Sequence, residues 1–227
     1  MKMADKIDVS VIIRTLNEER WIGHTIQSVL DLIPNPEIII VDNHSSDDTI
    51  HIIKNFIEDP SIPNKGKSYA NITIYDIDEY TPGKSINFGV SKSNNDIVML
   101  LSAHCTIQKF DKSILKKVQE FECIFGKQIP IWNGKKISPR YIWSHFVDNE
   151  IVNMYSKLED RYFFHNGASI FTRQILIDRP FNENLTGKED RYWINEYVSS
   201  GNKYLYLPNF VVKHHYTPSG NTWKGLA

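Results

Sequence analysis

Polar side chains that could bind a ligand gather directly after two predicted β-strands. Residues 14–18 (Arg-Thr-Leu-Asn-Glu) follow the first strand, and residues 42–49 (Asp-Asn-His-Ser-Ser-Asp-Asp-Thr) follow the second. Ligands of parallel α/β sheets bind at the carboxyl ends of the strands. Asp42 ends an otherwise apolar strand, where a buried carboxylate is costly without a partner. We therefore predict that Asp42 accepts hydrogen bonds from the base or ribose of a bound nucleotide.

The residues that follow Asp42 allow a purely structural interpretation as well. Ser45 or Ser46 can cap the next helix, and Asp47 and Asp48 suit the positive end of its dipole. For these four residues the sequence leaves both roles open.

The elements that must position these side chains follow from hydrophobic patterning. Short β-branched runs alternate with helical stretches over the first hundred residues, which is typical of βαβ units and a parallel sheet. The strands are expected over residues 8–14, 38–41, 71–77 and 96–101. The helices are expected over residues 18–30, 47–57 and 84–91, the last after a turn at 80–83.

Beyond residue 110 the pattern is less regular. Helices are expected over 113–125 and 189–200, a strand over 163–173, short strands over 204–207 and 210–213, and a helix or irregular lid over 148–160. Residues 130–143 lack clean periodicity. We predict one domain over residues 1–227, with a nucleotide-binding half up to about residue 109 and an irregular half from about residue 110.

Composition excludes several classes of protein. The chain has 227 residues, 41% hydrophobic and 23% charged, which excludes a disulfide miniprotein, a fibre and a disordered tail. Because 26 Lys and Arg balance 27 Asp and Glu, a net charge of -1 gives no reason to expect nucleic acid as a partner. The longest apolar runs, such as 38–41 and 97–101, are far shorter than the roughly 20 residues that cross a bilayer.

The first residues and the cysteines indicate a compartment. Residues 1–6 carry charge without the apolar stretch of a signal peptide, so a reducing cytoplasm is expected. Cys105 and Cys123 have no metal-binding spacing and do not predict a disulfide framework.

The order of four motifs resembles the family 2 glycosyltransferases of GT-A fold over nearly the whole chain. The motifs are Thr-Leu-Asn-Glu at 15–18, Val-Asp-Asn at 41–43, Ser-Ser-Asp-Asp-Thr at 45–49 and Gly-Lys-Ser-Ile-Asn-Phe-Gly at 83–89. The resemblance implies an α/β fold in which helices flank a mixed, mostly parallel, Rossmann-like sheet. It also implies that a nucleotide sugar is contacted by residues of these motifs and of the fourth strand, with Lys84 facing the diphosphate. The implied contacts are Thr15, Asn17 or Glu18, Asp42, Lys84, Asn87 and Ser102. A solvated first-turn lysine is the alternative for Lys84.

The sequence departs from the family after the fourth strand. The family usually carries Asp-X-Asp there to hold a divalent cation, and this chain has Ser102, Ala103 and His104. Related GT-A enzymes use Asp-X-His with a second histidine near the end of the domain, which implies that His104 with His214 or His215 binds Mn²⁺ or Mg²⁺. Two outcomes stay open: a loosely held cation, or metal-independent catalysis in which Lys84 and histidines neutralise the leaving group.

Glu189 and Asp190, which open a predicted helix, resemble the acceptor-side motif of the family. The resemblance implies that Asp190 is the general base and that Glu189 orients groups around it. The alternative is that both are only favourable acids in the first turn of a helix.

The expected activity is inverting transfer of a hexosyl group from a nucleoside diphosphate sugar to a glycan or lipid-linked acceptor, in bacterial surface polysaccharide synthesis. The expected location is the cytoplasm, with contact to the inner face of the cell membrane left open, as is the oligomeric state. A non-catalytic nucleotide- or glycan-binding relative is the main alternative, because Ser102 replaces a carboxylate. A sugar-phosphate nucleotidyltransferase fits less well, because residues 14–18 contain no glycine.

Overall fold

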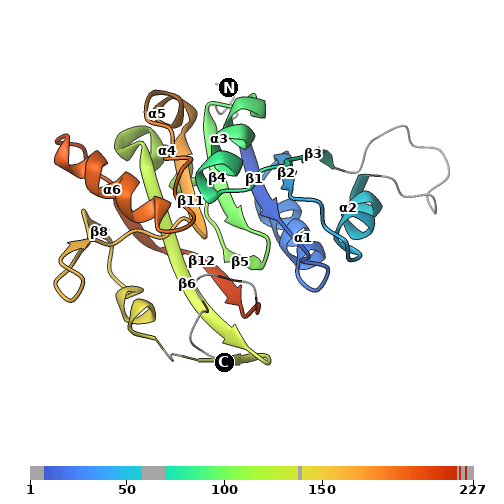
Figure 1. Cartoon of the computed structure of the whole chain (residues 1–227). Helices are drawn as coiled ribbons and strands as arrows, with labels where there is room; N and C mark the ends of the chain where they lie inside the picture. Colours follow the sequence, from blue (N-terminus) through green and yellow to red (C-terminus); the bar gives the residue numbers. More distant parts are fainter. Residues whose placement is uncertain (1–7, 58–69, 138–139, 219, 221–222, 224–227) are drawn as a thin grey trace, which may run out of the picture.

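Four parallel strands form the amino-terminal half of the central sheet. The computed structural model describes residues 8–57, 70–137, 140–218, 220 and 223. The strands are β1 (Val9–Thr15), β2 (Glu37–Asp42), β3 (Asn71–Asp76) and β4 (Ile97–Ser102), in the spatial order β3-β2-β1-β4. The four predicted strands are confirmed to within about one residue at each end. Their parallel pairing brings all four carboxyl ends to one edge of the sheet (Figure 1).

The second half of the chain extends the same sheet. The order continues from β4 through β11 (Ala168–Thr172), β6 (Cys123–Trp132), β12 (Leu205–His215) and β5 (Cys105–Lys109). Strand β11 is antiparallel to its neighbours β4 and β6, whereas β12 runs parallel to β6. Both halves therefore contribute to one mixed sheet. The remaining strands in the described part of the chain are short: β7 (Lys135–Lys136), β8 (Ile151–Val152), β9 (Tyr155–Ser156) and β10 (Arg161–Tyr162).

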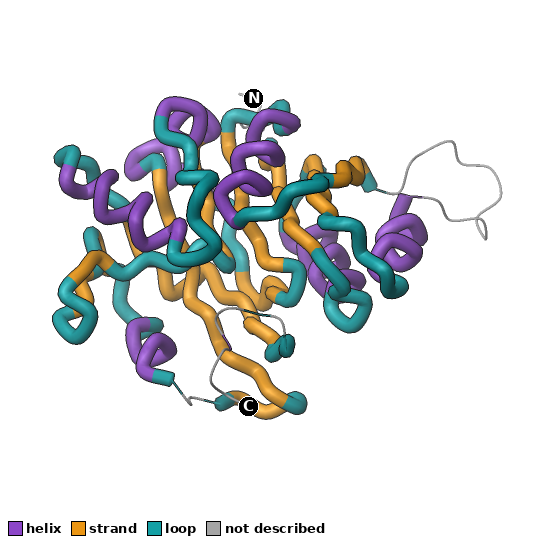
Figure 2. The backbone as a smooth tube through the Cα atoms, viewed as in Figure 1, coloured by secondary structure: helices purple, strands orange, loops and turns teal. Residues whose placement is uncertain are grey.

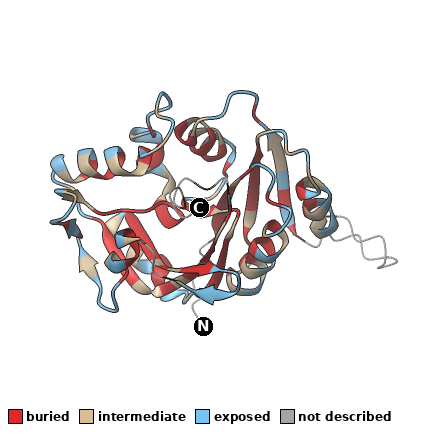
Figure 3. Cartoon of the chain, turned by 60° about the horizontal axis from the view of Figure 1, so that its bottom comes forward, coloured by how far each residue is buried: buried red, intermediate tan, exposed pale blue. Residues whose placement is uncertain are grey.

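Helices cover both faces of this sheet (Figure 2). One face packs against α1 (Ile22–Leu32), α2 (Thr49–Ile57) and α4 (Ser113–Phe121), and the other against α3 (Pro82–Lys92), α5 (Arg173–Asp178) and α6 (Glu189–Ser199). Alternation along β1 explains the two layers, because Val11 and Ile13 join the first apolar cluster and Ile12 joins the second. The buried residues accordingly lie along the sheet and the helix faces turned toward it (Figure 3). Among the described helices, none has the length and apolar content needed to cross a membrane.

The predictions for the second half were partly wrong. The helix expected over 113–125 ends at Phe121, Glu122 adopts a left-handed conformation, and β6 begins at Cys123. Buried residues follow one another in β6 because both faces of this strand are covered, and sequence alone does not separate such a run from a buried helix. The stretch 148–160 forms no helix and is irregular apart from the short strands β8 and β9. Its role as a lid stays a prediction.

Strand β12 replaces the two short strands expected on either side of Pro208. Its register with β6 shifts between Leu207 and Val211, so a bulge accommodates the proline without ending the strand. A short 3-10 helix, η1 (Tyr141–His145), begins near the end of the stretch 130–143 that lacked periodicity.

Candidate functional site

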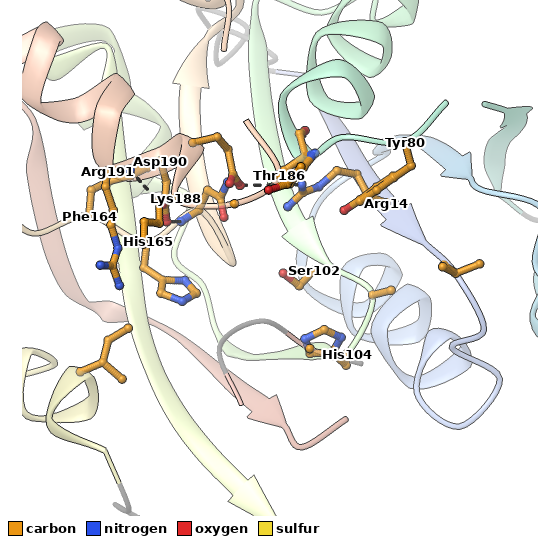
Figure 4. A pocket seen from close by; sticks show the side chains of 18 of the residues that line it. Arg14, Tyr80, Ser102, His104, Phe164, His165, Thr186, Lys188, Asp190 and Arg191 are labelled. Carbon is orange, nitrogen blue, oxygen red and sulfur yellow. Dashed lines mark hydrogen bonds and ion pairs between the residues drawn. The ribbon is translucent and has the colours of Figure 1, made fainter. Parts of the chain in front are cut away.

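A cavity of about 690 Å³ opens at the carboxyl ends of β1 and β4. One wall comes from the first half of the chain and the other from the segments around β10, β11 and α6 (Figure 4). The polar and charged residues that line it include Arg14, Thr15, Glu18, Ser102, His104, Arg140, Arg161, His165, Asn166, Lys188, Glu189, Asp190 and Arg191. The cavity therefore joins the predicted donor-binding loops to the predicted catalytic acids.

Strand register positions the first wall. Arg14 of β1 pairs with Ser102 of β4, and Thr15 pairs with Asp42 of β2. The Thr15 hydroxyl is buried and has no hydrogen-bond partner among the described residues. A buried hydroxyl without a partner is costly, so a ligand that bonds to it would recover free energy.

Asp42 and Asn17 support the rim of the cavity. The Asp42 carboxylate accepts hydrogen bonds from the backbone N–H of Ser45 (2.8 Å) and from its hydroxyl (2.5 Å). Asn17, with φ of 54°, donates its backbone N–H to the Ser45 hydroxyl at 2.9 Å and accepts from the Ser46 N–H at 2.8 Å. The partner that the buried Asp42 requires is thus the following turn. Ligand contacts of Asp42 and Asn17 stay a prediction, since neither is among the described lining residues.

Lys84 and Asn87 lie on α3 outside the described lining of the cavity. The Lys84 ammonium bonds to Glu79 at 2.7 Å, and this exposed ion pair raises the pKa of Lys84. The Asn87 amide donates to the carbonyl of Phe181 and accepts from its N–H, at 2.9 and 3.0 Å. Asn87 therefore ties α3 to the segment that precedes α6, and the predicted roles of both residues at the diphosphate stay untested.

Glu189 and Asp190 begin α6 and face the cavity. Glu189 accepts a hydrogen bond from the Asn166 amide at 2.8 Å and lies 3.9 Å from an Arg14 guanidinium nitrogen. Asp190 accepts the backbone N–H groups of Asn166 (3.4 Å) and Arg191 (2.8 Å). Burial raises the pKa of both carboxyl groups, and the charge of Asp190 adds to the rise at Glu189. Asp190 is therefore more basic than an exposed aspartate.

A chain of hydrogen bonds fixes the protonation of His214. The Gly167 N–H, 3.2 Å from His165 Nδ1, makes that nitrogen an acceptor. The amide group of Gln128 that lies 3.0 Å from the same nitrogen must then be its NH₂. The Gln128 oxygen therefore faces His214 Nδ1 at 2.7 Å, and this nitrogen carries a proton. Burial lowers the pKa of His214 well below its usual range, so its Nε2 presents a lone pair.

His104 completes this group from the other side. Its Nδ1 lies 2.8 Å from a Glu18 carboxylate oxygen, and its Nε2 lies 3.2 Å from Nε2 of His214. Two arrangements satisfy both nitrogens of His104. In the first, its Nε2–H donates to His214 and one proton lies between its Nδ1 and Glu18; in the second, a metal ion is bound by the Nε2 lone pairs of both histidines. In the second arrangement Glu18 and Gln128 each hold the Nδ1–H of a ligand, as outer-shell partners of metal-binding histidines do.

The adjacent histidine of β12 points elsewhere. His215 Nε2 lies 3.1 Å from the Thr106 hydroxyl, and its ring stacks on Trp21 with centroids 3.9 Å apart. Of the two candidates it is His214 whose ring meets His104. Within the part of the chain that the structure describes, no three His, Cys, Asp or Glu side chains are grouped for a metal ion. A cation at His104 and His214 would need further ligands from a substrate or water.

Sequence reasoning did not assign several residues that contribute to this site. Arg14 and Thr15 are the last two residues of β1, so the rule that found Thr15 could have found Arg14. Gln128 lies within β6, in a stretch whose strand pattern was not recognised, and His165 precedes β11 without a motif of its own. Only the long-range pairing of β6 with β12 brings Gln128 to His214.

Comparison with known proteins gives one family match. The family described as Glycosyl transferase family 2 matches residues 10–185. The match includes the first wall and the lining residues Arg140, Arg161, His165 and Asn166, whereas Glu189, Asp190 and Arg191 lie beyond it.

Two curated relatives carry detailed names. A Methanococcus voltae protein named dolichyl N-acetyl-alpha-D-glucosaminyl phosphate 3-beta-D-2,3-diacetamido-2,3-dideoxy-beta-D-glucuronosyltransferase is 29% identical, over 93% of this chain and 67% of the relative. A Campylobacter jejuni protein named GalNAc(5)-diNAcBac-PP-undecaprenol beta-1,3-glucosyltransferase is 25% identical, over 83% of this chain and 59% of the relative. The chain thus spans about two thirds or less of these proteins.

A solved structure has a similar fold. GalNAc-T7, crystallised with UDP, GalNAc and Mn²⁺, superposes with a TM-score of 0.71 over 95% of this chain and 45% of that chain. At 15% sequence identity the likeness concerns the fold alone.

Proposed function

The chain belongs to glycosyl transferase family 2 and has the GT-A fold, and from this we propose that it transfers a sugar from a nucleoside diphosphate sugar to a hydroxyl of a lipid-linked glycan. The names of both relatives support the acceptor class, since one acts on a dolichyl phosphate sugar and the other on a PP-undecaprenol glycan. The observation that carries the proposal is the cavity that holds Asp190 opposite His104 and Ser102. With a lipid-linked acceptor the reaction would take place at a membrane surface.

The proposed chemistry is a single inverting displacement. Asp190 removes the proton of the acceptor hydroxyl while its oxygen attacks the anomeric carbon. The bond from that carbon to the diphosphate oxygen breaks, and the nucleoside diphosphate leaves with the bonding electrons. The raised pKa of Asp190 suits a base that must be ionised at neutral pH yet hold the proton in the transition state. Glu189 orients Arg14 and Asn166 beside it.

The donor is proposed to bind along the first wall. Thr15, Ser102 and Glu18 line it, and the unpartnered Thr15 hydroxyl supports a polar contact with the nucleotide. Asp42 and Asn17 are proposed to act at its rim. Lys84 and Asn87 complete the set of residues proposed to bind the donor substrate. To contact the diphosphate, the Lys84 ammonium must leave its bond with Glu79.

We further propose that His104 and His214 hold a divalent cation, Mn²⁺ or Mg²⁺. The two facing Nε2 atoms fit such an ion, and their Nδ1–H groups are already engaged by Glu18 and Gln128. When bound, the cation would supply positive charge at the departing diphosphate. With only two neutral ligands from the described residues, binding is expected to be weak without the nucleotide.

Gln128 is expected to set cation affinity by fixing the proton on His214. Gln128→Leu removes the acceptor of the Nδ1–H and is expected to weaken Mn²⁺ binding about 10- to 100-fold. The matched variant Gln128→Glu keeps an acceptor oxygen. It should bind Mn²⁺ at least tenfold more tightly than the Gln128→Leu variant does. Free Mn²⁺ measured by electron paramagnetic resonance, with nucleoside diphosphate present, gives the affinities. Equal loss in both variants would contradict this role.

The proposed activity is tested with a panel of nucleotide sugars. The protein is incubated with each donor, with Mn²⁺ or with EDTA, and released nucleoside diphosphate is measured. We expect one donor to be hydrolysed slowly without acceptor and to raise the unfolding temperature. If some nucleotide binds but no donor is turned over with any lipid-linked acceptor, the chain is a non-catalytic relative. If none binds, the proposal fails entirely.

A further inference from the structure

Positive charge is concentrated in the cavity. Among its described lining residues are five cationic side chains, Arg14, Arg140, Arg161, Lys188 and Arg191, against three acidic ones, Glu18, Glu189 and Asp190. The whole chain has a net charge of -1, so this excess is local. Arg14 is paired with Glu189 on the border of the two walls. The remaining cations belong to the second half of the chain.

Arg161 and Arg191 share one carboxylate at the second wall. Arg161 of β10 bonds to one oxygen of Glu159 at 2.5 Å, and Arg191 of α6 lies 3.2 Å from the other. The Tyr141 hydroxyl also donates to Glu159, at 2.6 Å. Burial raises the pKa of Glu159, but the hydrogen bonds from Tyr141 and Arg161 outweigh it, and the net pKa lies below the usual value. Glu159 is therefore ionised at neutral pH.

Exposure distinguishes the two arginines. Both guanidinium groups face the Glu159 carboxylate, and the charges of both also favour the ionised form of the neighbouring Asp190. The Arg191 side chain is 30% exposed, whereas those of Arg161 and Glu159 are 12% and 11% exposed. Glu159 thus holds both guanidinium planes in place, and Arg191 presents donors that a ligand can reach. Arg140 lines the same cavity.

The position of Arg191 separates it from the proposed leaving group. Arg191 follows Asp190 directly, and both stand on the wall formed by α6, while Ser102 and His104 stand on the other side of the cavity (Figure 4). A nucleoside diphosphate bound at Ser102 and His104 would therefore leave the guanidinium of Arg191 to the second substrate. An anion near Arg191 would lie close to the hydroxyl that Asp190 deprotonates.

We propose that Arg191, held with Arg161 by Glu159, binds an anionic group of the acceptor, a phosphate or diphosphate ester attached to the acceptor sugar. This inference rests on the proposed function and adds the group that positions its acceptor. Guanidinium groups bind phosphate oxygens through paired, charge-assisted hydrogen bonds, which fix orientation as well as supply affinity. One sugar ring between the phosphate and the reacting hydroxyl would bridge Arg191 and Asp190.

Binding of a small probe tests this subsite directly. Glucose 1-phosphate is titrated by calorimetry into the protein saturated with the nucleoside diphosphate that stabilises it most. Inorganic phosphate and glucose serve as separate arms, which distinguish recognition of a bare anion from recognition of a sugar ester. We expect glucose 1-phosphate to bind more tightly than both. Arg191→Gln should weaken it tenfold or more, and Arg191→Lys, which keeps the charge, should weaken it less.

The controls separate this inference from the proposed function. The exposed Arg20, outside the described lining, is the matched control, and Arg20→Gln should leave glucose 1-phosphate binding unchanged. Affinity for the nucleoside diphosphate should be the same in Arg191→Gln and in the wild type. If Arg191→Gln weakens the binding of glucose 1-phosphate and of the nucleoside diphosphate equally, the arginine contacts the donor and the inference is wrong. It is also wrong if glucose 1-phosphate does not bind the wild-type complex, whereas failure of every nucleotide to bind refutes the proposed function itself.

Discussion

Asp190→Asn is expected to lower kcat by about 10² to 10⁴, the usual contribution of a positioned general base. The amide keeps an oxygen that can accept the backbone N–H groups of Asn166 and Arg191, so the local structure should persist. Donor binding should be unchanged, because Ser102 and His104 stand across the cavity. Single-turnover transfer and nucleotide binding, measured on the same protein, give the two quantities.

The pH dependence of the same variant gives an independent check. Because the pKa of Asp190 is raised in the folded protein, the neutral acid favours folding, and this stability is lost as pH rises through the raised pKa. At pH 7 Asp190→Asn should therefore be at least as stable as the wild type, and the difference should vanish in acid. In the wild type, kcat/KM should fall as pH drops through the raised pKa of Asp190. Normal turnover by Asp190→Asn, with Glu189→Gln inactive, would assign the base to Glu189 instead.

His214→Ala is expected to be the second most damaging substitution. It removes one of the two facing Nε2 atoms and should weaken Mn²⁺ binding in the nucleotide complex by about 100-fold or more, with a comparable loss of transfer at limiting Mn²⁺. His104→Ala should behave in the same way, with part of its activity restored by excess Mn²⁺. Because both residues would serve one ion, the double variant should lose little more than either single variant. Mn²⁺ titrations give both quantities: electron paramagnetic resonance of the free ion gives the affinity, and the transfer rate at each Mn²⁺ concentration gives the activity.

The competing arrangement, in which His104 donates a hydrogen bond to His214 without a metal ion, predicts a different pattern. Transfer by the wild type would then resist EDTA, and excess Mn²⁺ would not rescue His104→Ala. The exposed His51 on α2 is a matched control, and His51→Ala should change neither Mn²⁺ binding nor transfer. Thermal unfolding of His214→Ala must accompany these measurements, since His214 is 1% exposed and its loss leaves a cavity.

The first half of the fold could be predicted because its signals are local. Strands β2 and β4 contain uninterrupted apolar runs, and β1 is a mostly apolar, β-branched run. Each of these strands is bounded by turn and capping residues within a few positions. In the second half the decisive signals are long-range. Whether Cys123 continues a helix or begins β6 depends on pairing with β11 and β12, whose residues lie about 45 to 90 positions away in the chain.

The candidate site shows the same division. Asp42 was identified because a carboxylate at the end of a buried strand requires a partner, but the sequence could not say that Ser45 provides it. The sequence alone allows Arg191 to pair with Glu189 or with an anionic acceptor. Its protein partner is Glu159, which lies more than thirty positions away.

The sequence by itself determined that this chain has the α/β fold of nucleotide-sugar-dependent transferases, because the order of its motifs can be recognised without knowledge of any tertiary contact. It also determined that histidine stands where a carboxylate was expected at residue 104. Tertiary structure alone decided that His214 meets His104 while His215 stacks on Trp21. Adjacent residues of a strand point to opposite faces, so this choice depends on the register of β12 against β5 and β6, which no local pattern encodes.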